Sequence, residues 1–448
     1  MKKIHFIGIG GISMSALARL IKASGYYVQG SDIESTHITQ MLKKFKIPVM
    51  IGHKAENIVG VDTVVFNSAI KPNNPEMVEA ARQGLEIYER SKFLGIIASQ
   101  YKKVISISGT HGKTTTVGMT AEAMIGLKVN PTVHIGGELS HIGGNLFIGG
   151  KEYFITEACE YKRSFLTLPS FISVILNIEK DHMDYYTDID DIINAFSQFA
   201  TNTRQGGTVI LNGDDKIGFD IKTPNKKMIT FGLDDSFDVY ATNIEHKGGH
   251  YYFTACIEKK PIGKVKLSIV GRHNVYNALA TIAILHSLNL NVKKSLKYIS
   301  KFKGVKRRFE LIGKYKGASV ISDYAHHPTE IIATISAAKD ITKGRIIGVF
   351  QPHTYTRTRA LIKEFSQCFF GVDEIIIANV YAARESSIEG GSSLTLFEEV
   401  SKNIPNCTLI ENFSDIKLKV RSLVKKDDTV LILGAGNINQ IAEEILKG

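Results

Sequence analysis

A lysine and a threonine follow directly after a short glycine turn in the segment V-I-S-I-S-G-T-H-G-K-T-T-T, residues 104–116. Gly109 and Gly112 lack a Cβ, so the backbone N–H groups between them can close on phosphate oxygens. Lys113 can reach the outer phosphates, and Thr114 can offer its hydroxyl to Mg²⁺. ATP is the natural ligand of such a loop. We predict that its binding residues are Gly109, Thr110, His111, Gly112, Lys113, Thr114 and Thr115.

This turn needs a strand before it and a helix after it. Residues 104–108 are predicted to form the apolar strand, and a helix is predicted to follow the glycine turn, so that its first N–H groups favour an anion. The turn has two residues between its glycines, whereas the general P-loop pattern has four. A second apolar strand, residues 153–156, ends at Glu157, which is placed to meet the metal ion that Thr114 holds. The alternative to a phosphate-binding loop at residues 109–112 is a glycine turn that binds no ligand.

The N-terminal residues combine another strand with a glycine turn. Residues 4–7 form a short apolar strand, and G-I-G-G-I-S after it nearly matches the dinucleotide-binding fingerprint, with Ser13 in place of the third glycine. About twenty residues further on, Asp32 ends a second strand, where an oxidoreductase would bind the ribose of a nicotinamide. NAD is therefore an alternative, although the same unit can hold any nucleoside diphosphate at its helix N-terminus.

Several segments resemble one protein family. The turn G-T-H-G-K-T at residues 109–114 resembles the Mur ligases, ATP-dependent amide-forming enzymes of cell-wall synthesis, and its His111 resembles the muramate-binding members. The resemblance covers nearly the whole chain. Further similar segments are G-H at 52–53, F-N-S-A-I at 66–70, R-S-K-F-L at 90–94, N-I-E-K-D-H-M-D at 177–184, R-H-N-V-Y-N-A at 272–278, R-R-F-E at 307–310, D-Y-A-H-H-P-T-E at 323–330 and Q-P-H-T-Y-T-R-T at 351–358.

The resemblance implies that the N-terminal residues bind UDP and not NAD. A turn residue without a ligand is the alternative for Ser68, and a solvated charge at a helix start is the alternative for Arg90. The UDP-sugar-binding residues implied are Gly10, Gly11, Ile12, Ser13, Asp32, His53, Ser68 and Arg90.

The resemblance also implies roles in catalysis and in metal and substrate binding. An imidazole is an unusual Mg²⁺ ligand, so the role of His182 depends on the resemblance alone, and a loop histidine is the alternative. For Asn274 the alternative is a helix N-cap, with Asn277 merely exposed. The catalytic residues implied are Lys113, Arg308 and His182, and the metal ligands are Thr114, Glu157 and His182. ATP would also meet Asn274, Asn277, Arg308 and Asp323, and the amino acid would meet His326, His353 and Arg357.

The chain departs from the family pattern at several positions. Thr354 stands where many members have an arginine, so the carboxylate of the incoming amino acid would depend on Arg357 and His353. Ser322 replaces the first of two aspartates. Cys159 is interpreted as structural. Relatives that carry a carbamylated lysine have it shortly after residue 182, but residues 183–203 contain no lysine.

Composition limits the classes of function. The formal charge is +11, yet basic residues form no long run with interleaved aromatics, so anionic small substrates are favoured over nucleic acid. The four cysteines are far apart, which predicts neither a zinc site nor a disulfide framework and favours a reducing cytoplasm. Lys2 and Lys3 before an apolar run resemble a signal peptide, but three glycines interrupt that run. No run is long enough to insert into a membrane.

The order of strands and helices predicts an α/β protein of three domains. Residues 1–98 would form a Rossmann-like UDP-sugar-binding domain, residues 99–305 a central P-loop ATP-binding domain, and residues 306–448 a Rossmann-like amino-acid-binding domain. The glycine-rich segment 131–150 is predicted as loop around short strands. A monomer and a homodimer are both compatible with the sequence.

The function implied by the resemblance is ATP-dependent ligation of L-alanine to the carboxylate of UDP-N-acetylmuramate through an acyl phosphate, with Mg²⁺ as cofactor. This reaction belongs to peptidoglycan precursor synthesis. A ligase that adds a preformed tripeptide to the same muramate is a second possibility. A nucleotide-binding dehydrogenase, which would not need the Lys113 turn, and a regulatory ATPase also stay open.

Overall fold

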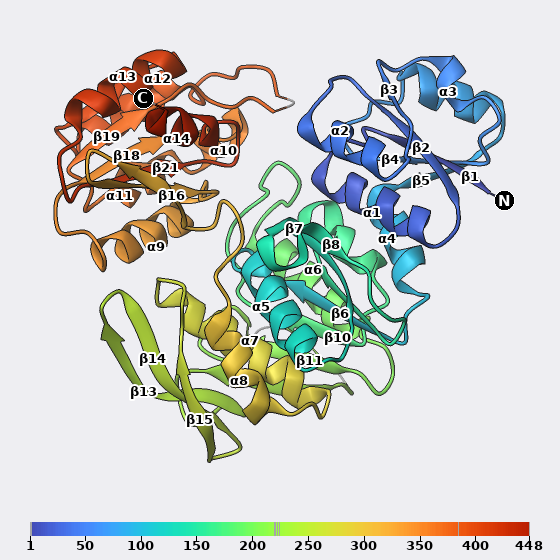
Figure 1. Ribbon diagram of the computed structural model, residues 1–448, viewed down its shortest axis with the longest axis horizontal. Coiled ribbons are helices and arrows are strands. Elements are labelled where there is room, and N and C mark those ends of the chain that lie inside the picture. Colours follow the sequence, from blue (N-terminus) through green and yellow to red (C-terminus); the bar gives the residue numbers. More distant parts are fainter. Residues whose placement is uncertain (1, 219–220, 222, 224, 384, 448) are drawn as a thin grey trace. The chain divides into compact units, whose positions relative to one another are not determined.

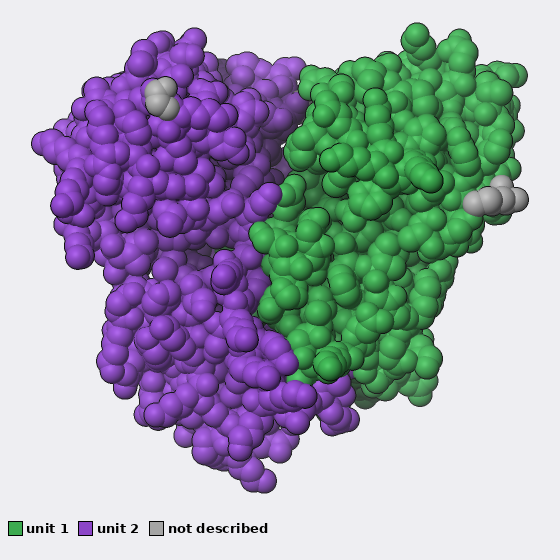
Figure 2. All heavy atoms as spheres, viewed as in Figure 1, with its two compact units in different colours: residues 1–177, 193–211, 215–229 green, residues 178–192, 212–214, 230–448 purple. Residues whose placement is uncertain are grey.

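The computed structural model describes residues 2–218, 221, 223, 225–383 and 385–447. Contacts between Cα atoms divide the chain into two compact units, which Figure 2 colours separately. Unit 1 comprises residues 1–177, 193–211 and 215–229. Unit 2 comprises residues 178–192, 212–214 and 230–448.

Unit 1 begins with a five-stranded parallel sheet in the order β3-β2-β1-β4-β5 (Figure 1). Because all five strands run in one direction, their carboxyl ends share one edge, where α/β sheets bind ligands. Its strands are β1 (Lys3–Ile7), β2 (Tyr27–Asp32), β3 (Val49–Ile51), β4 (Thr63–Phe66) and β5 (Glu86–Glu89). Its helices are α1 (Ile12–Ala23), α2 (His37–Lys44), η1 (Ala55–Ile58), α3 (Pro75–Arg82) and α4 (Arg90–Ala98).

The next strands of unit 1 lie in the order β11-β10-β6-β9-β7-β8, and β8 alone runs antiparallel to its neighbour. In this order β6 has β10 on one side and β9 on the other, so the turn after β6 lies beside the loops that follow both. The strands are β6 (Lys103–Ser108), β7 (Thr132–Leu139), β8 (Gly144–Phe147), β9 (Tyr153–Glu157), β10 (Ile172–Ile175) and β11 (Thr208–Asn212). The helices are α5 (Lys113–Gly126), η2 (Ser140–Ile142), η3 (Tyr161–Thr167) and α6 (Ile189–Thr201).

Unit 2 contains an antiparallel arrangement of β13, β14 and β15, with the end of β12 parallel to β13. Two helices follow these strands. The elements are β12 (Lys227–Gly232), β13 (Val239–Lys247), β14 (His250–Ile257), β15 (Lys260–Lys266), α7 (His273–Ser287) and α8 (Val292–Lys301).

A six-stranded sheet completes unit 2 in the order β16-β17-β21-β18-β19-β20, in which only β16 is antiparallel to its partner. Its strands are β16 (Glu310–Tyr315), β17 (Ala318–Asp323), β18 (Ile346–Phe350), β19 (Glu374–Ile377), β20 (Cys407–Leu409) and β21 (Thr429–Leu433). Its helices are α9 (Pro328–Lys339), α10 (Tyr355–Ala360), α11 (Ile362–Cys368), α12 (Ser393–Ser401), α13 (Phe413–Leu423) and α14 (Asn439–Leu446).

Alternate residues of β18 belong to two separate cores, as the two-residue period of a strand requires. Ile346 and Phe350 pack with residues of α9, α11 and α12. Ile347 and Val349 pack with residues of α13 and α14. Helices therefore cover both faces of the sheet, and its central strands β18 and β21 are buried along their whole length.

The structure confirms the predicted α/β class with three sheets. Most predicted strands agree with the observed ones to within a few residues. The prediction for segment 131–150 was wrong in part, because β7 is an eight-residue strand that pairs with β8 and β9. The glycines at 136 and 137 lie inside this strand, where the pairing with β8 is irregular. The bounds of the three predicted domains stay predictions.

No helix among the described residues has the length and apolar character that crossing a bilayer requires. All four cysteines carry free thiols. Burial raises the pKa of the Cys159 thiol to about 11, with the carboxylate of Glu160 adding to the effect. This thiol stays protonated near neutral pH, in agreement with the structural role predicted for Cys159.

Candidate active site

The glycine turn after β6 has the backbone shape that its sequence requires. Gly109 has φ +131° and Gly112 has φ +87°, both in the region that disfavours side chains. A Cβ on Gly109 would also lie 3.0 Å from the backbone nitrogen of Asn177. Asn177 fixes the turn, because its carbonyl accepts from Thr110 N at 3.0 Å and its side-chain oxygen accepts from His111 N at 2.8 Å. The first N–H groups of α5 follow the turn and can bind phosphate.

Lys113 lies at the first position of α5 and is held from several sides. Its Nζ donates to Glu160 at 2.9 and 3.0 Å and to the carbonyl oxygens of Gly109 and Thr110. Burial opposes the charged ammonium, but Glu160 outweighs it, so the pKa of Lys113 is raised. Lys113 is therefore a permanently charged group inside the turn, with Glu160 as its internal counter-ion.

Thr114 and Glu157 supply oxygen donors at the ends of neighbouring elements. Thr114 is nearly buried in the first turn of α5, and Glu157 is the last residue of β9, the strand beside β6. Gly136 N donates to Glu157 Oε1 at 2.7 Å, which holds the carboxylate in place. A hydroxyl and a carboxylate are hard oxygen ligands of the kind that Mg²⁺ prefers, so these two residues fit the predicted metal.

The first sheet presents its predicted UDP-sugar residues at its carboxyl edge. Gly10 N donates to Asp32 Oδ2 at 2.8 Å, which ties the turn after β1 to the end of β2. A Cβ on Gly10 would lie 2.8 Å from the same oxygen, so a larger residue here would have to displace the Asp32 carboxylate. Gly11 is the N-cap of α1, so Ile12 and Ser13 open that helix. The turn therefore presents a helix N-terminus to an anion.

Ser13 is bonded to two residues far away in sequence. Its Oγ lies 3.1 Å from His134 Nε2 and accepts from Arg90 Nη1 at 3.3 Å. His134 Nδ1 lies 3.0 Å from Thr156 Oγ1. Burial, reinforced by the charge of Arg90, lowers the pKa of His134 to about 4. Arg90 therefore faces a neutral imidazole, and its positive charge is available for an anionic ligand.

His53 and Ser68 lie in loops after β3 and β4. His53 Nδ1 lies 3.0 Å from Ser31 Oγ and 3.3 Å from the buried carboxylate of Glu76. Ser68 is exposed in a turn. The structure thus gives His53 buried supporting groups, which the sequence did not predict.

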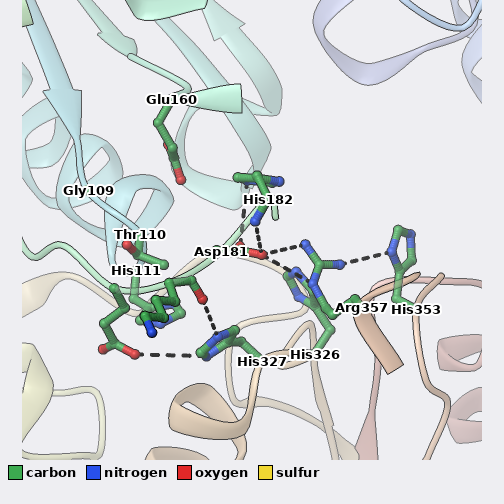
Figure 3. A network of polar contacts seen from close by, with 12 residues as sticks. Gly109, Thr110, His111, Glu160, Asp181, His182, His326, His327, His353 and Arg357 are labelled. Carbon is green, nitrogen blue, oxygen red and sulfur yellow. Dashed lines mark hydrogen bonds and ion pairs between the residues drawn. The ribbon is translucent and has the colours of Figure 1, made fainter. Parts of the chain in front are cut away.

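Within unit 2, Arg357 is paired with Asp181 (Figure 3). Arg357 Nη2 donates to Asp181 Oδ1 at 2.9 Å, and Nη1 lies 3.3 Å from His353 Nδ1. Burial opposes the Asp181 carboxylate, but His182 and Arg357 outweigh it and hold its pKa far below the ordinary value. His182 has φ +56° and its N–H donates to the same carboxylate at 2.7 Å. The predicted amino-acid-binding pair, Arg357 and His353, is therefore brought together.

Glu330 organises the residues at the start of α9. It accepts from His326 N at 3.0 Å and from His327 N at 3.3 Å, which forms a capping box with His327 as the N-cap. Arg308 Nη1 lies 3.6 Å from Glu330 Oε1, and its guanidinium lies 5.0 Å from the ring centre of Tyr324. The structure thus places Arg308 and His326 on the same carboxylate.

Asp323 is the buried last residue of β17. Its carboxylate accepts from Thr334 Oγ1 at 2.8 Å and from Ala325 N at 3.1 Å. Burial raises its pKa although Arg308 lies nearby and opposes the shift. Thr354, at the position of the missing arginine, has φ +68° and is the N-cap residue of α10, without a side-chain hydrogen bond to the helix.

Asn274 and Asn277 lie on one face of α7, as predicted from their spacing. Asn277 Nδ2 donates to Asn274 Oδ1 at 2.8 Å, and Asn274 Nδ2 donates to the carbonyl of Val270. Both side chains are buried, and the N-cap position belongs to Arg272. The alternative of a capping Asn274 with an exposed Asn277 was therefore wrong, whereas contact with a nucleotide stays a prediction.

Four acidic residues with structural importance for the site were missed: Glu76, Glu160, Asp181 and Glu330. Glu160 directly follows Cys159 and Asp181 stands inside the segment 177–184, but their partners are 47 and 176 residues away. A signal existed for Glu330, because glutamate three residues after the N-cap is typical of a capping box. Nothing in the sequence pattern indicated Glu76.

Three family models match most of this chain. Residues 3–102 match the Mur ligase family catalytic domain, residues 107–285 the Mur ligase middle domain, and residues 307–436 the Mur ligase glutamate ligase domain. The crystal structure of a murein peptide ligase from Psychrobacter arcticus has a TM-score of 0.76 at 24% identity and covers 100% of this chain and 98% of that one, which shows a shared fold.

Two similar proteins carry the same description. The UDP-N-acetylmuramate–L-alanine ligase of Caldicellulosiruptor bescii is 42% identical over 449 residues, which cover 100% of this chain and 99% of the relative. The crystal structure of the UDP-N-acetylmuramate-alanine ligase of Thermotoga maritima has a TM-score of 0.85 at 27% identity, covering 100% of this chain and 99% of that one. With three matching domains and a full-length relative at this identity, the chain belongs to the Mur ligase family.

Proposed function

We propose that this protein joins L-alanine to the carboxylate of UDP-N-acetylmuramate at the expense of ATP. The observation that carries the proposal is the full-length similarity, 42% identity, to curated ligases of that description. The Lys113 turn after β6 supports it, because a dehydrogenase has no use for a charged phosphate cradle beside its dinucleotide turn.

In the proposed reaction a muramate carboxylate oxygen attacks the γ-phosphorus of ATP, and ADP leaves. The amino group of alanine, in its neutral form, then attacks the acyl carbon, and inorganic phosphate leaves as the amide forms and the nitrogen loses a proton. Neither step needs a protein nucleophile. The protein's task is to position the reactants and to stabilise charge on the moving phosphoryl group.

Unit 1 supplies the first group of proposed roles. Lys113 neutralises the phosphates, and the N–H groups after Gly112 bind them. Thr114 and Glu157 would hold Mg²⁺, which when bound neutralises the phosphate oxygens. Asp32, with Gly10, would meet the ribose, while the turn to Ser13 and the charge of Arg90 would meet the diphosphate. Metal binding, the roles of individual residues and the domain boundaries remain parts of the proposal.

Unit 2 supplies the second group of proposed roles, which rest on the sequence. Arg308 would act on phosphate charge, and Asp323 and the pair Asn274 and Asn277 would bind the nucleotide. The carboxylate of alanine would bind to Arg357, with His353 and His326 nearby. His182 would be a metal ligand. A cytoplasmic location is part of the proposal, consistent with four free thiols.

The test is release of inorganic phosphate from ATP by the purified full-length protein with UDP-N-acetylmuramate and one acceptor at a time. Alanine, serine, glycine and a preformed tripeptide are supplied in turn. We expect alanine to give the highest kcat/KM, with a modest preference over serine and glycine, because a single methyl group discriminates by only about 1 to 3 kcal/mol. Turnover with the tripeptide alone would replace this proposal by the peptide-ligase alternative.

A further inference from the structure

The fully buried carboxylate of Glu76 lies at the centre of a polar cluster between α3 and the first sheet. Glu76 is the second residue of α3 and has no exposed surface. Its Oε2 accepts from Ser31 Oγ at 2.6 Å and lies 3.3 Å from His5 Nε2 and 3.3 Å from His53 Nδ1. Its Oε1 accepts from Asn57 Nδ2. Burial alone would raise its pKa, but these hydrogen bonds, led by that of His5, lower the pKa to about 2, so the group is a carboxylate.

The cluster fixes the proton of His5. Gln29 Nε2 donates to the carbonyl of Asn57 at 2.6 Å, which identifies that atom as the amide nitrogen. The same nitrogen lies 3.3 Å from His5 Nδ1, so Nδ1 is the acceptor and the proton of a neutral His5 is on Nε2. His5 Nε2 therefore donates to Glu76. His5 is fully buried, so this part of the cluster has no contact with solvent.

The same reasoning fixes the proton of His53. The single hydroxyl proton of Ser31 is directed to Glu76, so Ser31 Oγ faces His53 Nδ1 with a lone pair at 3.0 Å. Glu76, the other neighbour of Nδ1, is an acceptor as well. His53 must therefore carry its proton on Nδ1, and a neutral His53 has a lone pair on Nε2. Among the described residues no protein partner is assigned to Nε2, and the side chain is 13% exposed.

The strand order places this lone pair at one end of the predicted nucleotide site. Gly10 follows β1, Asp32 ends β2, and His53 follows β3, and these strands are consecutive neighbours in the sheet. Two strand spacings amount to about 10 Å. A nucleoside diphosphate with its phosphates at the turn and its ribose at Asp32 would bring its base to His53.

We propose that Glu76 is a positioning residue that holds the Nδ1–H tautomer of His53, so that His53 Nε2 accepts a hydrogen bond from N3–H of uracil and selects uridine over cytidine nucleotides. The inference rests on the proposed function for the identity of the ligand. Cytosine carries a lone pair at N3, which would face the lone pair of Nε2. A site built in this way rejects the wrong base because a buried acceptor is left unpaired.

The experiment measures binding of UDP and of CDP to the full-length protein by calorimetry, in the wild type and in three variants. Glu76→Gln removes the acceptor for His53, His53→Gln removes the reading group, and Glu79→Gln is a control on the same helix, where Glu79 pairs with Arg82. We expect the wild type and Glu79→Gln to bind UDP about tenfold or more tightly than CDP. In Glu76→Gln and His53→Gln this ratio falls toward one, while ATP affinity is unchanged.

A second measurement separates positioning from a merely structural role. In ¹⁵N-histidine-labelled protein, the resonances that disappear in His53→Gln belong to His53, and in the wild type they show protonated Nδ1 and unprotonated Nε2. In Glu76→Gln the signature changes to a mixture of tautomers. An unchanged tautomer and an unchanged UDP to CDP ratio in a folded Glu76→Gln protein would overturn the proposal.

The outcomes also separate this proposal from the proposed function. If Glu76→Gln does not fold, His53→Gln decides, and an unchanged ratio in that variant overturns the proposal. If the wild type binds UDP selectively but releases no phosphate with UDP-N-acetylmuramate and alanine, the ligase assignment fails and the present inference stands. A wild type that binds UDP and CDP equally overturns the inference whatever its turnover.

Discussion

The positive charge of Lys113 is balanced by groups of the protein itself. The carboxylate of Glu160 and two backbone carbonyls surround its ammonium group in the turn. An arriving triphosphate must compete with Glu160 for this lysine, and the nearly buried Glu160 would then lie near phosphate oxygens of like charge. Glu160 therefore holds the Lys113 side chain within the turn.

Replacing Lys113 by alanine should lower phosphate release by on the order of 10² to 10³. UDP-N-acetylmuramate binding should stay close to that of the wild type, because the residues predicted to bind it are on the first sheet. Steady-state kinetics and calorimetry check the two parts, with Lys102→Ala as the control because that lysine is exposed and pairs with Glu152. Loss of UDP-sugar binding with intact ATP turnover would contradict the assignment.

Glu157→Gln should raise the Mg²⁺ concentration needed for half-maximal activity, on the order of tenfold, because a charged oxygen ligand becomes neutral while the strand keeps its shape. The measurement is a Mg²⁺ titration of phosphate release. Glu152→Gln, one residue before the other end of the same strand, is the control. Superimposable titrations of the wild type and Glu157→Gln would remove Glu157 from the metal site.

The lowered pKa of Glu76 also leads to a prediction of how the stability of the fold depends on pH. Its pKa is about 2 in the folded protein, against an ordinary value of 4.5. A carboxyl whose pKa is lowered by folding stabilises the fold above pH 4.5, and this contribution is lost as the pH falls toward 2. It amounts to about 3 kcal/mol. The difference in melting temperature between the wild type and Glu76→Gln should therefore shrink between pH 6 and pH 3, and a constant difference would refute this account.

At the scale of elements, strand β7 holds the carboxylate of Glu157, the last residue of β9, in place. Gly136 lies in β7, and a Cβ there would lie 2.8 and 2.9 Å from the two oxygens of Glu157. The close approach is what lets the backbone N–H of Gly136 hold the carboxylate. A glycine inside this strand is thus explained by a contact and not by a turn.

Gly136→Ala should therefore imitate Glu157→Gln, with a raised Mg²⁺ requirement and little loss of stability, because the added methyl group displaces the carboxylate. Gly150→Ala is the matched control, since a Cβ there would meet its nearest neighbour, Asn130 O, at an ordinary 3.5 Å. Mg²⁺ titrations and thermal melting check both variants. A Gly136→Ala protein with normal Mg²⁺ dependence would show that the carboxylate is not held by this strand.

The strands and turns could be predicted because their signals are local. The sequence predicts β6, its glycine turn and α5, since an apolar run, two glycines and a helix start follow one another. The length of β7 was underestimated, because its two internal glycines resemble a loop between short strands. The spacing of Asn274 and Asn277 correctly predicted that both lie on one face of a helix, since helical neighbours three residues apart share a face.

The electrostatic partners could not be predicted, because they join distant parts of the chain. Ser31 and Glu76 are 45 residues apart and Asp181 and Arg357 are 176 residues apart. Only the tertiary fold brings such residues together, and no pattern within one element encodes it. Buried acidic residues are thus where sequence reasoning is weakest, since a glutamate in isolation predicts a solvated surface.

At the scale of the whole molecule, the formal charge of +11 should favour binding of anions over a distance. Raising the ionic strength from about 0.05 to about 0.3 M shortens the screening length to below about 10 Å, and the KM values for ATP and UDP-N-acetylmuramate should rise severalfold. The KM for alanine, a zwitterion without net charge, should hardly change. A parallel rise in all three KM values would indicate a general effect of salt on the protein.

The parallel strands of unit 1 have their predicted ligand-binding residues at or after their carboxyl ends and none at their amino ends. Gly206 lies at such an amino end, in the exposed loop before β11, with φ +74° and, apart from its two chain neighbours, no atom of the described residues within 4 Å of its missing Cβ. Loops of this kind tolerate inserted peptides best. A short tag or a fluorophore attachment site placed beside Gly206 should therefore leave catalysis intact, which gives the protein a natural handle for immobilisation and single-molecule work.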